Sequence, residues 1–417
     1  AGDAGLAHDR FIWRMKRDLY DEALEMILQR STSAGALGRP EAWAERRAVL
    51  ARYLMRRDRA VEAYEVASRH FLTEGQDFID LEFLAGFIAL RRLDDPARAL
   101  AHFRHLETGV STPISTARAK YWQGRAEEAL GQDATASYKA AAQYQTAFYG
   151  LMAAEKLGLP LDPAFLASPR VPDWQAAAYT RSSVLTAVRL LLDAGDRTLA
   201  KRFLLHLGES QDGTGLAQMA QMALDWDEPH LALVVAKAAA ERGLILPDAY
   251  YPVPAFVPED LAVSRALALA ITRRESEFDP AARSSADARG LMQLLPGTAK
   301  LMAEKLGVEH EVGKLLSDPA YNVTMGAAYL AEMVERFGPS IALIASGYNA
   351  GPKRPEGWMT EFGDPRSADV DIVDWVESIP FTETRTYVMR VAEGVVIYRA
   401  RLKGEVGPVN ITAELRG

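Results

Sequence analysis

The sequence contains no cysteine, and this absence excludes several kinds of chemistry at once. Disulfide frameworks, cysteine nucleophiles, thiolate zinc sites and iron–sulfur clusters all require that residue. A chain without cysteine suits an oxidising compartment, where a free thiol is a liability. The sequence also lacks a histidine pair at metal-ligand spacing and a glycine-rich phosphate loop. It therefore predicts neither a metal nor an organic cofactor.

Excess positive charge and long apolar runs are missing as well. Lys and Arg number 48 against 56 Asp and Glu, which gives a net charge of −8. The deficit is −3 over residues 1–250 and −5 over residues 251–417, so no segment is basic. A nucleic-acid partner is disfavoured because phosphates must be neutralised by Lys and Arg. Since no apolar run approaches the roughly 20 residues that span a bilayer, we expect a soluble chain with no membrane span.

The chain begins with Ala1 and without the charged-then-apolar opening of a secretory leader. We expect that a leader was removed or that the start was trimmed, and the sequence does not choose between these. What is present is ample material for folding. Hydrophobic residues make up 49% of 417 residues and charged residues 25%. This length and composition predict about two to three domains with buried cores.

The first part of the chain has the periodicity of successive helices. Apolar residues recur at three- and four-residue spacing, and a small residue follows a turn with Asp or Asp-Pro four times at intervals of 40, 36 and 37 residues. These small residues are Ala23, Ala63, Ala99 and Ala136. The interval predicts stacked helix–turn–helix units, in which Tyr64, Phe103 and Tyr138 allow close helix packing. A generic helical bundle remains the alternative because the interval drifts.

Two proline-rich stretches interrupt this pattern. One runs from Pro160 to Pro172 and the other from Pro247 to Pro258. Proline cannot continue a helix, so both are expected to be connectors. The sequence therefore predicts a helical repeat-like domain over residues 1–170, a helical linker domain over residues 171–245, and a third, mainly helical domain over residues 246–417.

Residues 259–280 place a carboxylate on an apolar helix face. Val263, Leu267 and Ile271 follow one another at four-residue steps, and the next step reaches Glu275. A buried carboxylate must be paired, capped or protonated. Burial that raises its pKa would keep Glu275 protonated near neutral pH and allow it to act as a general acid.

Periodicity alone leaves a structural role for Glu275 equally open. The residue could form an ion pair with a nearby arginine, for which the candidates are Arg273, Arg274 and Arg289. Its acidic neighbours are weaker candidates for catalysis. Glu277 lies about 200° away around the helix, and Asp279, which precedes Pro280, is expected to end the helix.

Four sequence blocks within residues 259–400 resemble the motif blocks of the soluble lytic transglycosylases. These blocks are ESEFDP, RSSADARGLMQLLPGTA, SGYNAGP and SIPFTETRTYV, in the family's order. YWQGRAEEALG and TAFYGLMAAEKLG resemble the helical arm of the larger soluble members. The resemblance implies an all-α fold. An N-terminal α-solenoid, or superhelical arm, would precede a lysozyme-like, mainly helical catalytic domain similar to goose-type lysozyme.

The resemblance also implies the roles of individual residues. Glu275 would be the single catalytic acid/base. Six residues would bind the glycan along the groove: Ser284, Gln293, Leu295, Tyr348, Asn349 and Glu383. Leu295 stands where the family frequently has Met, and Gly347 where Ala is usual; neither change removes a functional group.

The residues of these blocks also have plainer interpretations. GLMQLLPGT reads as a helix–helix turn in which Thr298 caps the next helix, with Gly290 suited to close approach of a ligand. Tyr348 is either a core aromatic residue or a hydroxyl directed into a cleft. Trp358 and Trp375 are candidates for stacking on sugars.

The activity implied by the resemblance is cleavage of the β-1,4 bond between N-acetylmuramic acid and N-acetylglucosamine in peptidoglycan, with formation of 1,6-anhydro ends and without consumption of water. The partner would be peptidoglycan glycan strands, in the periplasm of a Gram-negative bacterium. Two other functions remain open. One is a hydrolytic, goose-type-like muramidase, and the other is a helical scaffold that carries a catalytically dead glycan-binding domain.

Overall fold

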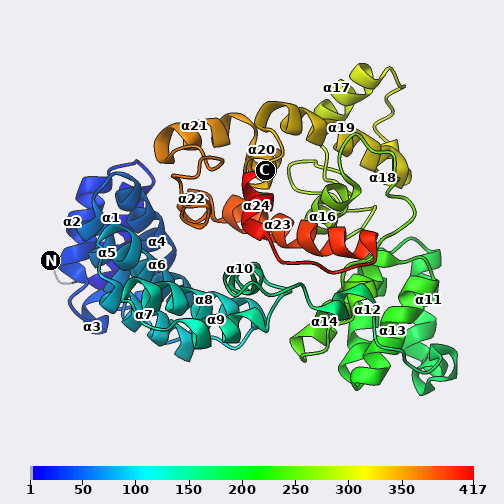
Figure 1. Ribbon diagram of the computed structural model, residues 1–417, viewed down its shortest axis with the longest axis horizontal. Coiled ribbons are helices and arrows are strands. Elements are labelled where there is room, and N and C mark those ends of the chain that lie inside the picture. Colours follow the sequence, from blue (N-terminus) through cyan, green and yellow to red (C-terminus); the bar gives the residue numbers. More distant parts are fainter. Residues whose placement is uncertain (1–2) are drawn as a thin grey trace. The chain divides into compact units, whose positions relative to one another are not determined.

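The structure is a computed structural model that describes residues 3–417, and it is built from helices (Figure 1). These residues form 24 α-helices and three short 3₁₀ helices. Their β-structure is limited to isolated bridges, such as the one between Arg283 and Arg289. The predicted all-α class is therefore confirmed. None of the helices in this part of the chain combines the length and the apolarity of a bilayer-crossing segment.

The chain divides into two compact units. The first, which we call the repeat unit, joins the residues up to Leu159 with Val373–Thr382. The second, the large unit, contains Pro160–Ile372 and Glu383–Gly417. The first boundary falls at the start of the proline-rich stretch after Leu159. The return of Val373–Thr382 to the repeat unit has no counterpart in the sequence analysis, and the three-domain division given there stays a prediction.

The repeat unit contains ten helices of the N-terminal part and one from the C-terminal part. They are α1 (Ala4–Met15), α2 (Tyr20–Arg30), α3 (Ala34–Leu37), α4 (Pro40–Arg56), α5 (Ala60–Ser68), α6 (Gln76–Arg92), α7 (Pro96–Thr108), α8 (Pro113–Ala129), α9 (Thr135–Ala142), α10 (Phe148–Lys156) and α22 (Ile372–Ser378). Successive helices pack as pairs, with α4 on α5, α6 on α7 and α8 on α9. This pairing is typical of helix–turn–helix repeats.

Close approach within two of these pairs depends on a glycine that faces an aromatic ring. A Cβ atom on Gly86 of α6 would lie 2.5 Å from the ring of Phe103 in α7. A Cβ atom on Gly124 of α8 would lie 2.6 Å from the ring of Tyr138 in α9. The prediction that Phe103 and Tyr138 allow close helix packing is confirmed.

The recurring small residues follow the predicted pattern in three repeats and depart from it in the fourth. Ala23, Ala63 and Ala99 are fully buried. Ala136 is exposed, and the buried small residue of α9 is its neighbour Ser137. Neighbouring residues on a helix point about 100° apart, so Ser137 can face the interior while Ala136 faces solvent.

The large unit carries the remaining helices. They are η1 (Pro163–Leu166), η2 (Trp174–Ala176), η3 (Ala178–Arg181), α11 (Ser183–Asp193), α12 (Arg197–Glu209), α13 (Gly213–Asp225), α14 (Pro229–Glu241), α15 (Pro247–Tyr250), α16 (Arg265–Ser276), α17 (Pro296–Leu306), α18 (Lys314–Ser317), α19 (Pro319–Phe337), α20 (Ile341–Ala350), α21 (Lys353–Phe362), α23 (Thr382–Lys403) and α24 (Ile411–Arg416). Helices α11 to α14 share a hydrophobic core of their own, which includes Leu204, Met219 and Leu231.

Helix α16 lies in the interior of the large unit. Its residues from Ala266 to Thr272 are buried, and it packs on α19. Its contact with α23 is close, because a Cβ atom on Gly394 would lie 3.0 Å from the Cβ atom of Ala270. The end of α16 and the first half of α23 are thereby brought together, and α20 packs on α19 beside them.

Two predicted helix boundaries are wrong. Helix α16 ends at Ser276 rather than at Asp279, because Glu277 and Phe278 adopt left-handed backbone conformations with φ of 53° and 64°. Helix α17 begins at Pro296 after Leu295, so Thr298 lies inside the helix and does not cap it. Proline at the first helical position takes the place of the expected cap, since its missing N–H group needs no partner there.

Candidate active site

Glu275 lies in the last turn of α16, on the same face as the buried residues Leu267 and Ile271. This is the position that the four-residue spacing predicts. The side chain of Glu275 is mostly buried but keeps some access to solvent.

The carboxyl group of Glu275 accepts a hydrogen bond from a tyrosine of α23. The hydroxyl of Tyr387 donates to Oε1 over 2.6 Å, and the tyrosine ring is buried. Tyr387 lies in the fourth motif block, but it is not among the site residues predicted from the sequence. Its place one turn after Glu383 in α23 could have pointed to it, since residues four apart share a helix face.

The protonation of Glu275 is decided by opposing influences. The net effect raises the pKa of Glu275 from 4.5 to about 7, and burial is the largest influence because the charged form loses hydration. The hydrogen bond from Tyr387 and the positive charge of Arg274 lower the pKa, whereas the negative charge of Glu383 raises it further. Burial prevails, so the pKa lies high enough for the carboxyl group to carry a proton near neutral pH.

The alternative of a structural ion pair with arginine is wrong for Glu275. The Nε–H of Arg273 donates to a backbone carbonyl oxygen over 2.9 Å. Arg289 is paired with Asp287 at 3.0 Å. Within residues 3–417, no arginine, Arg274 included, forms an ion pair with Glu275. The carboxyl group is held by a neutral donor and not by a cation, which is why its pKa can stay high.

The neighbouring carboxylate Glu277 points elsewhere, as predicted. Its Oε1 atom lies 2.5 Å from Nζ of Lys237. Its backbone carbonyl oxygen contacts Nδ1 of His230 at 2.9 Å. Asp279 accepts the backbone N–H of Ala281 over 3.0 Å, and so its carboxylate stabilises the turn after the helix.

A loop at residues 289–293 lies beside the end of α16 and is fastened at several backbone atoms. The Oγ atom of Ser276 donates to the carbonyl oxygen of Leu291 over 2.7 Å. The buried side chain of Asn322 accepts the N–H of Met292 and donates to the carbonyl oxygens of Arg289 and Leu315, each over 2.9 Å. Asn322 is not among the residues predicted from the sequence, and its only signal there is a polar residue directly beside the apolar face of α19.

Gly290 is required in this loop by its backbone and by its neighbours. Its φ is 70°, and a Cβ atom would lie 2.0 Å from the carbonyl oxygen of Leu315 and 2.4 Å from Nδ2 of Asn322. The predicted close approach therefore exists, but it is to the protein's own backbone rather than to a ligand. A substitution here would displace the contacts that fasten the loop.

Tyr348 contacts this loop from α20, and Gln293 fastens it from within. The hydroxyl of Tyr348 donates to the carbonyl oxygen of Met292 over 2.8 Å. The amide nitrogen of Gln293 donates to the carbonyl oxygens of Ala282 and Gly290 over 3.0 and 2.9 Å. Burial, and then the charge of Glu275, raise the pKa of Tyr348 well above its ordinary value. Tyr348 is therefore near Glu275, with its hydroxyl engaged by the loop.

The remaining residues of the third and fourth blocks connect α20 to α23. The hydroxyl of Thr384 donates to Oδ1 of Asn349 over 2.6 Å, and Thr384 is buried. Glu383, in the first turn of α23, is exposed, and its charge acts on the pKa of Glu275. The structure thus brings Glu275, Tyr348, Asn349 and Glu383 into one region, as the motif blocks predict.

Other predicted residues have different surroundings. Ser284 is exposed, and its hydroxyl accepts the backbone N–H of Ala288 over 3.0 Å within a tight turn. Leu295 is 47% exposed directly before α17. The prediction that Trp358 and Trp375 stack on sugars is wrong, because the two side chains are only 5% and 1% exposed.

The arrangement supports proton transfer. Among residues 3–417, no group of three or more His, Asp and Glu side chains is placed to hold a metal ion. A carboxyl group with a pKa of about 7 can donate a proton to one ligand atom and then accept a proton from another. The buried donor Tyr387 orients that group, and the fastened loop provides a rigid wall beside it.

Comparisons with known proteins agree with this geometry. Residues 259–369 match the family described as the transglycosylase SLT domain. A Haemophilus influenzae relative named after the soluble lytic murein transglycosylases is 34% identical over 283 residues, which is 65% of this chain and 45% of the relative. The soluble lytic murein transglycosylase of Salmonella typhimurium is 30% identical over 285 residues, which is 67% of this chain and 43% of the relative. The chain thus spans less than half the length of these relatives.

Solved structures share the fold. The lytic transglycosylase Slt of Pseudomonas aeruginosa, crystallised as an inactive mutant, has a TM-score of 0.71 and 24% sequence identity, and the match covers 98% of this chain and 69% of that one. The 70 kDa soluble lytic transglycosylase of Escherichia coli has a TM-score of 0.58 and 22% identity, with 97% and 73% covered. At this identity the similarity concerns the fold, and it agrees with the predicted helical arm and lysozyme-like domain.

Proposed function

The chain belongs to the soluble lytic transglycosylase family, and from this premise we propose that it cleaves the β-1,4 bond between N-acetylmuramic acid and N-acetylglucosamine in peptidoglycan. The cut strand ends in a 1,6-anhydro-N-acetylmuramic acid residue. Relatives in H. influenzae and S. typhimurium, both Gram-negative bacteria, support peptidoglycan strands as the partner and the periplasm as the site of action. The observation that carries the proposal is the carboxyl group of Glu275, which is mostly buried, has a pKa of about 7 and is held by Tyr387.

In the first step Glu275 acts as an acid. Its proton passes to the glycosidic oxygen as the bond between that oxygen and C1 of N-acetylmuramic acid breaks. The leaving N-acetylglucosamine thereby gains a hydroxyl group, and Glu275 becomes a carboxylate. The oxygen of the substrate's own acetamido group bonds to C1 and stabilises the positive charge that develops there, as an oxazolinium ion.

In the second step the carboxylate of Glu275 acts as a base. It removes the proton from the C6 hydroxyl of the same sugar, and the C6 oxygen bonds to C1 as the acetamido oxygen leaves. The ring closes, Glu275 is protonated again, and no water is consumed. A nucleophile held in the same molecule has a high effective concentration, which lowers the barrier by several kcal/mol.

This mechanism explains why one carboxyl group near neutral pKa is sufficient. Enzymes that hydrolyse glycosides usually place two carboxyl groups on either side of the bond, one as acid and one as nucleophile or base. Here Glu275 performs both proton transfers. Glu383 is exposed in the first turn of α23, and we assign it to substrate binding along the glycan groove.

The other residues are proposed to bind and orient the glycan. Tyr348 and Gln293 hold the loop at residues 289–293 and would orient the acetamido group through it. Asn349, whose Oδ1 atom accepts a hydrogen bond from Thr384, is proposed to line the cleavage site. The exposed residue Ser284 is assigned to the acetamido and peptide-bearing region of the sugar, and the exposed residue Leu295 to the lining of the groove.

Mass spectrometry of the products released from purified peptidoglycan sacculi tests the proposal. Anhydro-muropeptides are expected from the wild-type protein and none from the Glu275→Gln variant. Muropeptides heavier by one water, with reducing ends, would instead show a hydrolytic muramidase. Equal release by both proteins would show that Glu275 is not the acid. No release by the folded wild-type protein would favour the scaffold function.

A further inference from the structure

A short helix between two parts of the large unit belongs to the repeat unit. The chain leaves the large unit after Ile372, forms α22, and re-enters the large unit at Glu383. Its next helix, α23, starts at Thr382 and carries Glu383, Thr384 and Tyr387 in its first two turns. The segment held by the repeat unit is therefore continuous in sequence with residues of the candidate active site.

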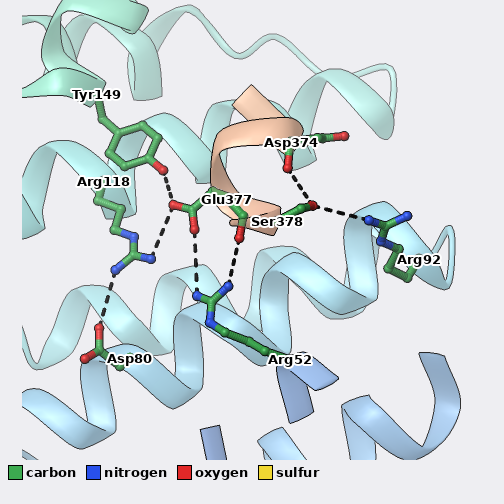
Figure 2. Close-up of polar contacts among 8 residues, drawn as sticks. All are labelled: Arg52, Asp80, Arg92, Arg118, Tyr149, Asp374, Glu377 and Ser378. Atoms are coloured by element: carbon green, nitrogen blue, oxygen red, sulfur yellow. Dashed lines mark hydrogen bonds and ion pairs between the residues drawn. The ribbon is translucent and has the colours of Figure 1, made fainter. Parts of the chain in front are cut away.

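Glu377 is the centre of the contact between α22 and the repeat helices (Figure 2). It is 0% exposed. The hydroxyl of Tyr149, from α10, donates to its Oε1 atom, and Nη2 of Arg118, from α8, lies 3.4 Å from the same oxygen. Arg52, from α4, donates through Nη1 to the backbone carbonyl oxygen of Glu377 over 2.8 Å, and its Nη2 lies 3.8 Å from Oε2.

Further polar contacts fix the two ends of α22. Nη2 of Arg92, from α6, donates to Oγ of Ser378 over 3.4 Å, and that hydroxyl donates to the carbonyl oxygen of Asp374 over 2.7 Å. Nε of Arg91 lies 2.5 Å from the carboxylate of Asp374. The apolar residues of the segment are buried with them, namely Val373, Trp375, Val376 and Ile379.

The repeat unit supplies the charges that Glu377 requires. A carboxylate removed from water is costly unless cations and hydrogen-bond donors surround it. Burial is the largest influence on the pKa of Arg118 and lowers it, but Glu377, Tyr149 and Asp80 together raise the pKa overall, so the guanidinium stays charged. Arg118 also lies over the ring of Phe83 in α6, with 3.3 Å from Cζ to the ring centroid. Residues from three repeat helices, α4, α8 and α10, thus form a receptor for one acidic side chain.

We propose that the repeat unit is a receptor for α22 and that Glu377 is a positioning residue for the reaction at Glu275. Only Ile379, Pro380 and Phe381 separate the end of α22 from the start of α23. Three residues allow little slack, since an extended chain spans at most about 3.5 Å per residue, and Pro380 restricts the backbone further. By holding α22, the repeat unit fixes the first turns of α23 and, through them, the hydrogen bond from Tyr387 to Glu275.

The inference rests on the proposed function for its kinetic consequence but not for its structural one. Two measurements therefore test it. One is kcat and KM for product release from sacculi, and the other is hydrogen exchange of the backbone amides of residues 383–388. If the wild-type protein releases no product, the proposed function fails, and the exchange measurement still decides whether Glu377 orders α23.

Glu377→Gln is the principal variant and Tyr149→Phe the milder one, because the latter removes a single hydroxyl. We expect Glu377→Gln to lower kcat at least tenfold, to change KM less than threefold, and to accelerate exchange at residues 383–388 at least tenfold. Tyr149→Phe should shift both quantities in the same direction by less. The double variant should resemble Glu377→Gln alone, because both changes disrupt the same contact.

The control is Arg47→Met, in the same unit. Arg47 is fully buried and donates to the carbonyl oxygen of Val66 and to Oγ of Ser31, away from α22. It should lower the thermal stability of the repeat unit without changing kcat or the exchange of residues 383–388. Equal effects of Arg47→Met and Glu377→Gln would overturn the inference, as would unchanged exchange in Glu377→Gln. If Glu377→Gln fails to fold, the test compares kcat and the exchange of residues 383–388 in Tyr149→Phe with those in Arg47→Met. The inference then requires that Tyr149→Phe changes both quantities and that Arg47→Met changes neither.

Discussion

The hydroxyl of Tyr387 donates a hydrogen bond of 2.6 Å to the carboxyl group of Glu275 from a different helix. A neutral donor stabilises the carboxylate without the long-range field of a cation. Burial therefore remains the larger influence, and the pKa of Glu275 is about 7.

The first prediction concerns stability. Because the folded protein binds the Glu275 proton more tightly than the unfolded chain, wild-type stability falls as pH rises from 4.5 through about 7. The neutral variant Glu275→Gln avoids this loss. At pH 8 it should be more stable than wild type by at most about 3 kcal/mol, since each pKa unit corresponds to about 1.4 kcal/mol. At pH 4 the difference should vanish. Chemical denaturation at both pH values measures it.

The matched control for this change is Glu277→Gln, which neutralises a carboxylate two residues away. Glu277 is paired with Lys237, and this pair lowers its pKa although burial opposes the shift. Its neutralisation should lower stability at pH 8, the opposite sign to Glu275→Gln, and should leave product release intact. A variant of Glu275 that is less stable than wild type at pH 8 would contradict the high pKa.

The second prediction concerns the pH dependence of the rate. Product release requires the protonated form of Glu275 in the free enzyme, so kcat/KM should fall as pH rises through about 7. Tyr387→Phe removes a hydrogen bond that lowers the pKa. The fall should therefore move to higher pH, while the maximal rate drops by about tenfold to a hundredfold because the carboxyl group is no longer oriented. A pH–rate profile of turbidity loss in sacculi suspensions measures both effects.

Glu383→Gln should have the opposite effect on the same profile. The negative charge of Glu383 raises the pKa of Glu275, so its removal should move the fall in kcat/KM to lower pH. Because Glu383 is exposed, salt should screen the interaction. The difference from wild type should be larger at 20 mM than at 500 mM NaCl. A salt-independent difference would show that Glu383 acts by contact and not by charge.

The fourth prediction concerns the loop at residues 289–293. Asn322→Ala leaves the N–H of Met292 and the carbonyl oxygens of Arg289 and Leu315 without their side-chain partner. The carbonyl oxygen of Arg289 still accepts the N–H of Leu294, so two groups are left unpaired, the N–H of Met292 and the carbonyl oxygen of Leu315. Each buried polar group left unpaired costs about 1–3 kcal/mol, so we expect a loss of at least about 2 kcal/mol in the free energy of unfolding, measured by denaturant titration. Thr298→Ala, in the neighbouring helix α17, should cost less than about 1 kcal/mol because Thr298 does not cap it.

The fifth prediction concerns the helix pairs of the repeat unit. Gly124→Ala would bring a Cβ atom to 2.6 Å from the ring of Tyr138 and force α8 and α9 apart. Overpacking of this kind costs about 1–3 kcal/mol. Gly35→Ala is the control, since the nearest atom to its Cβ would be 3.9 Å away. Thermal unfolding should show a lower transition temperature for Gly124→Ala only. Equal transitions would contradict the close packing of these helices.

The helices and the buried-face position of Glu275 could be predicted because both depend on local spacing, whereas its role as acid and base was implied only by the resemblance of the motif blocks. Leu267, Ile271 and Glu275 lie one turn apart on any α-helix, so their common face follows from the order of residues alone. The end of α16 could not be predicted. The helix ends because Glu277 and Phe278 adopt left-handed backbone conformations. A glycine at such a position would have marked the helix end in the sequence, but neither residue is glycine.

The partners of the predicted residues could not be inferred in the same way. Glu275 and Tyr387 are 112 residues apart, and nothing in the spacing of either helix says which residues of the other it meets. The same holds for Trp375, whose aromatic ring is compatible with sugar stacking or with burial. Its surroundings in the repeat unit decide for burial.

The sequence by itself determined the all-helical class, the repeated helix pairs of the first part, the motif blocks and the carboxylate on the buried face of α16. The tertiary structure decided what that carboxylate contacts, and hence its pKa, because desolvation and hydrogen bonding depend on residues distant in sequence. It also decided that α22 folds with the repeat unit. Only the arginines and the tyrosine from separate helices make burial of Glu377 favourable, and their convergence is a property of the packed helices.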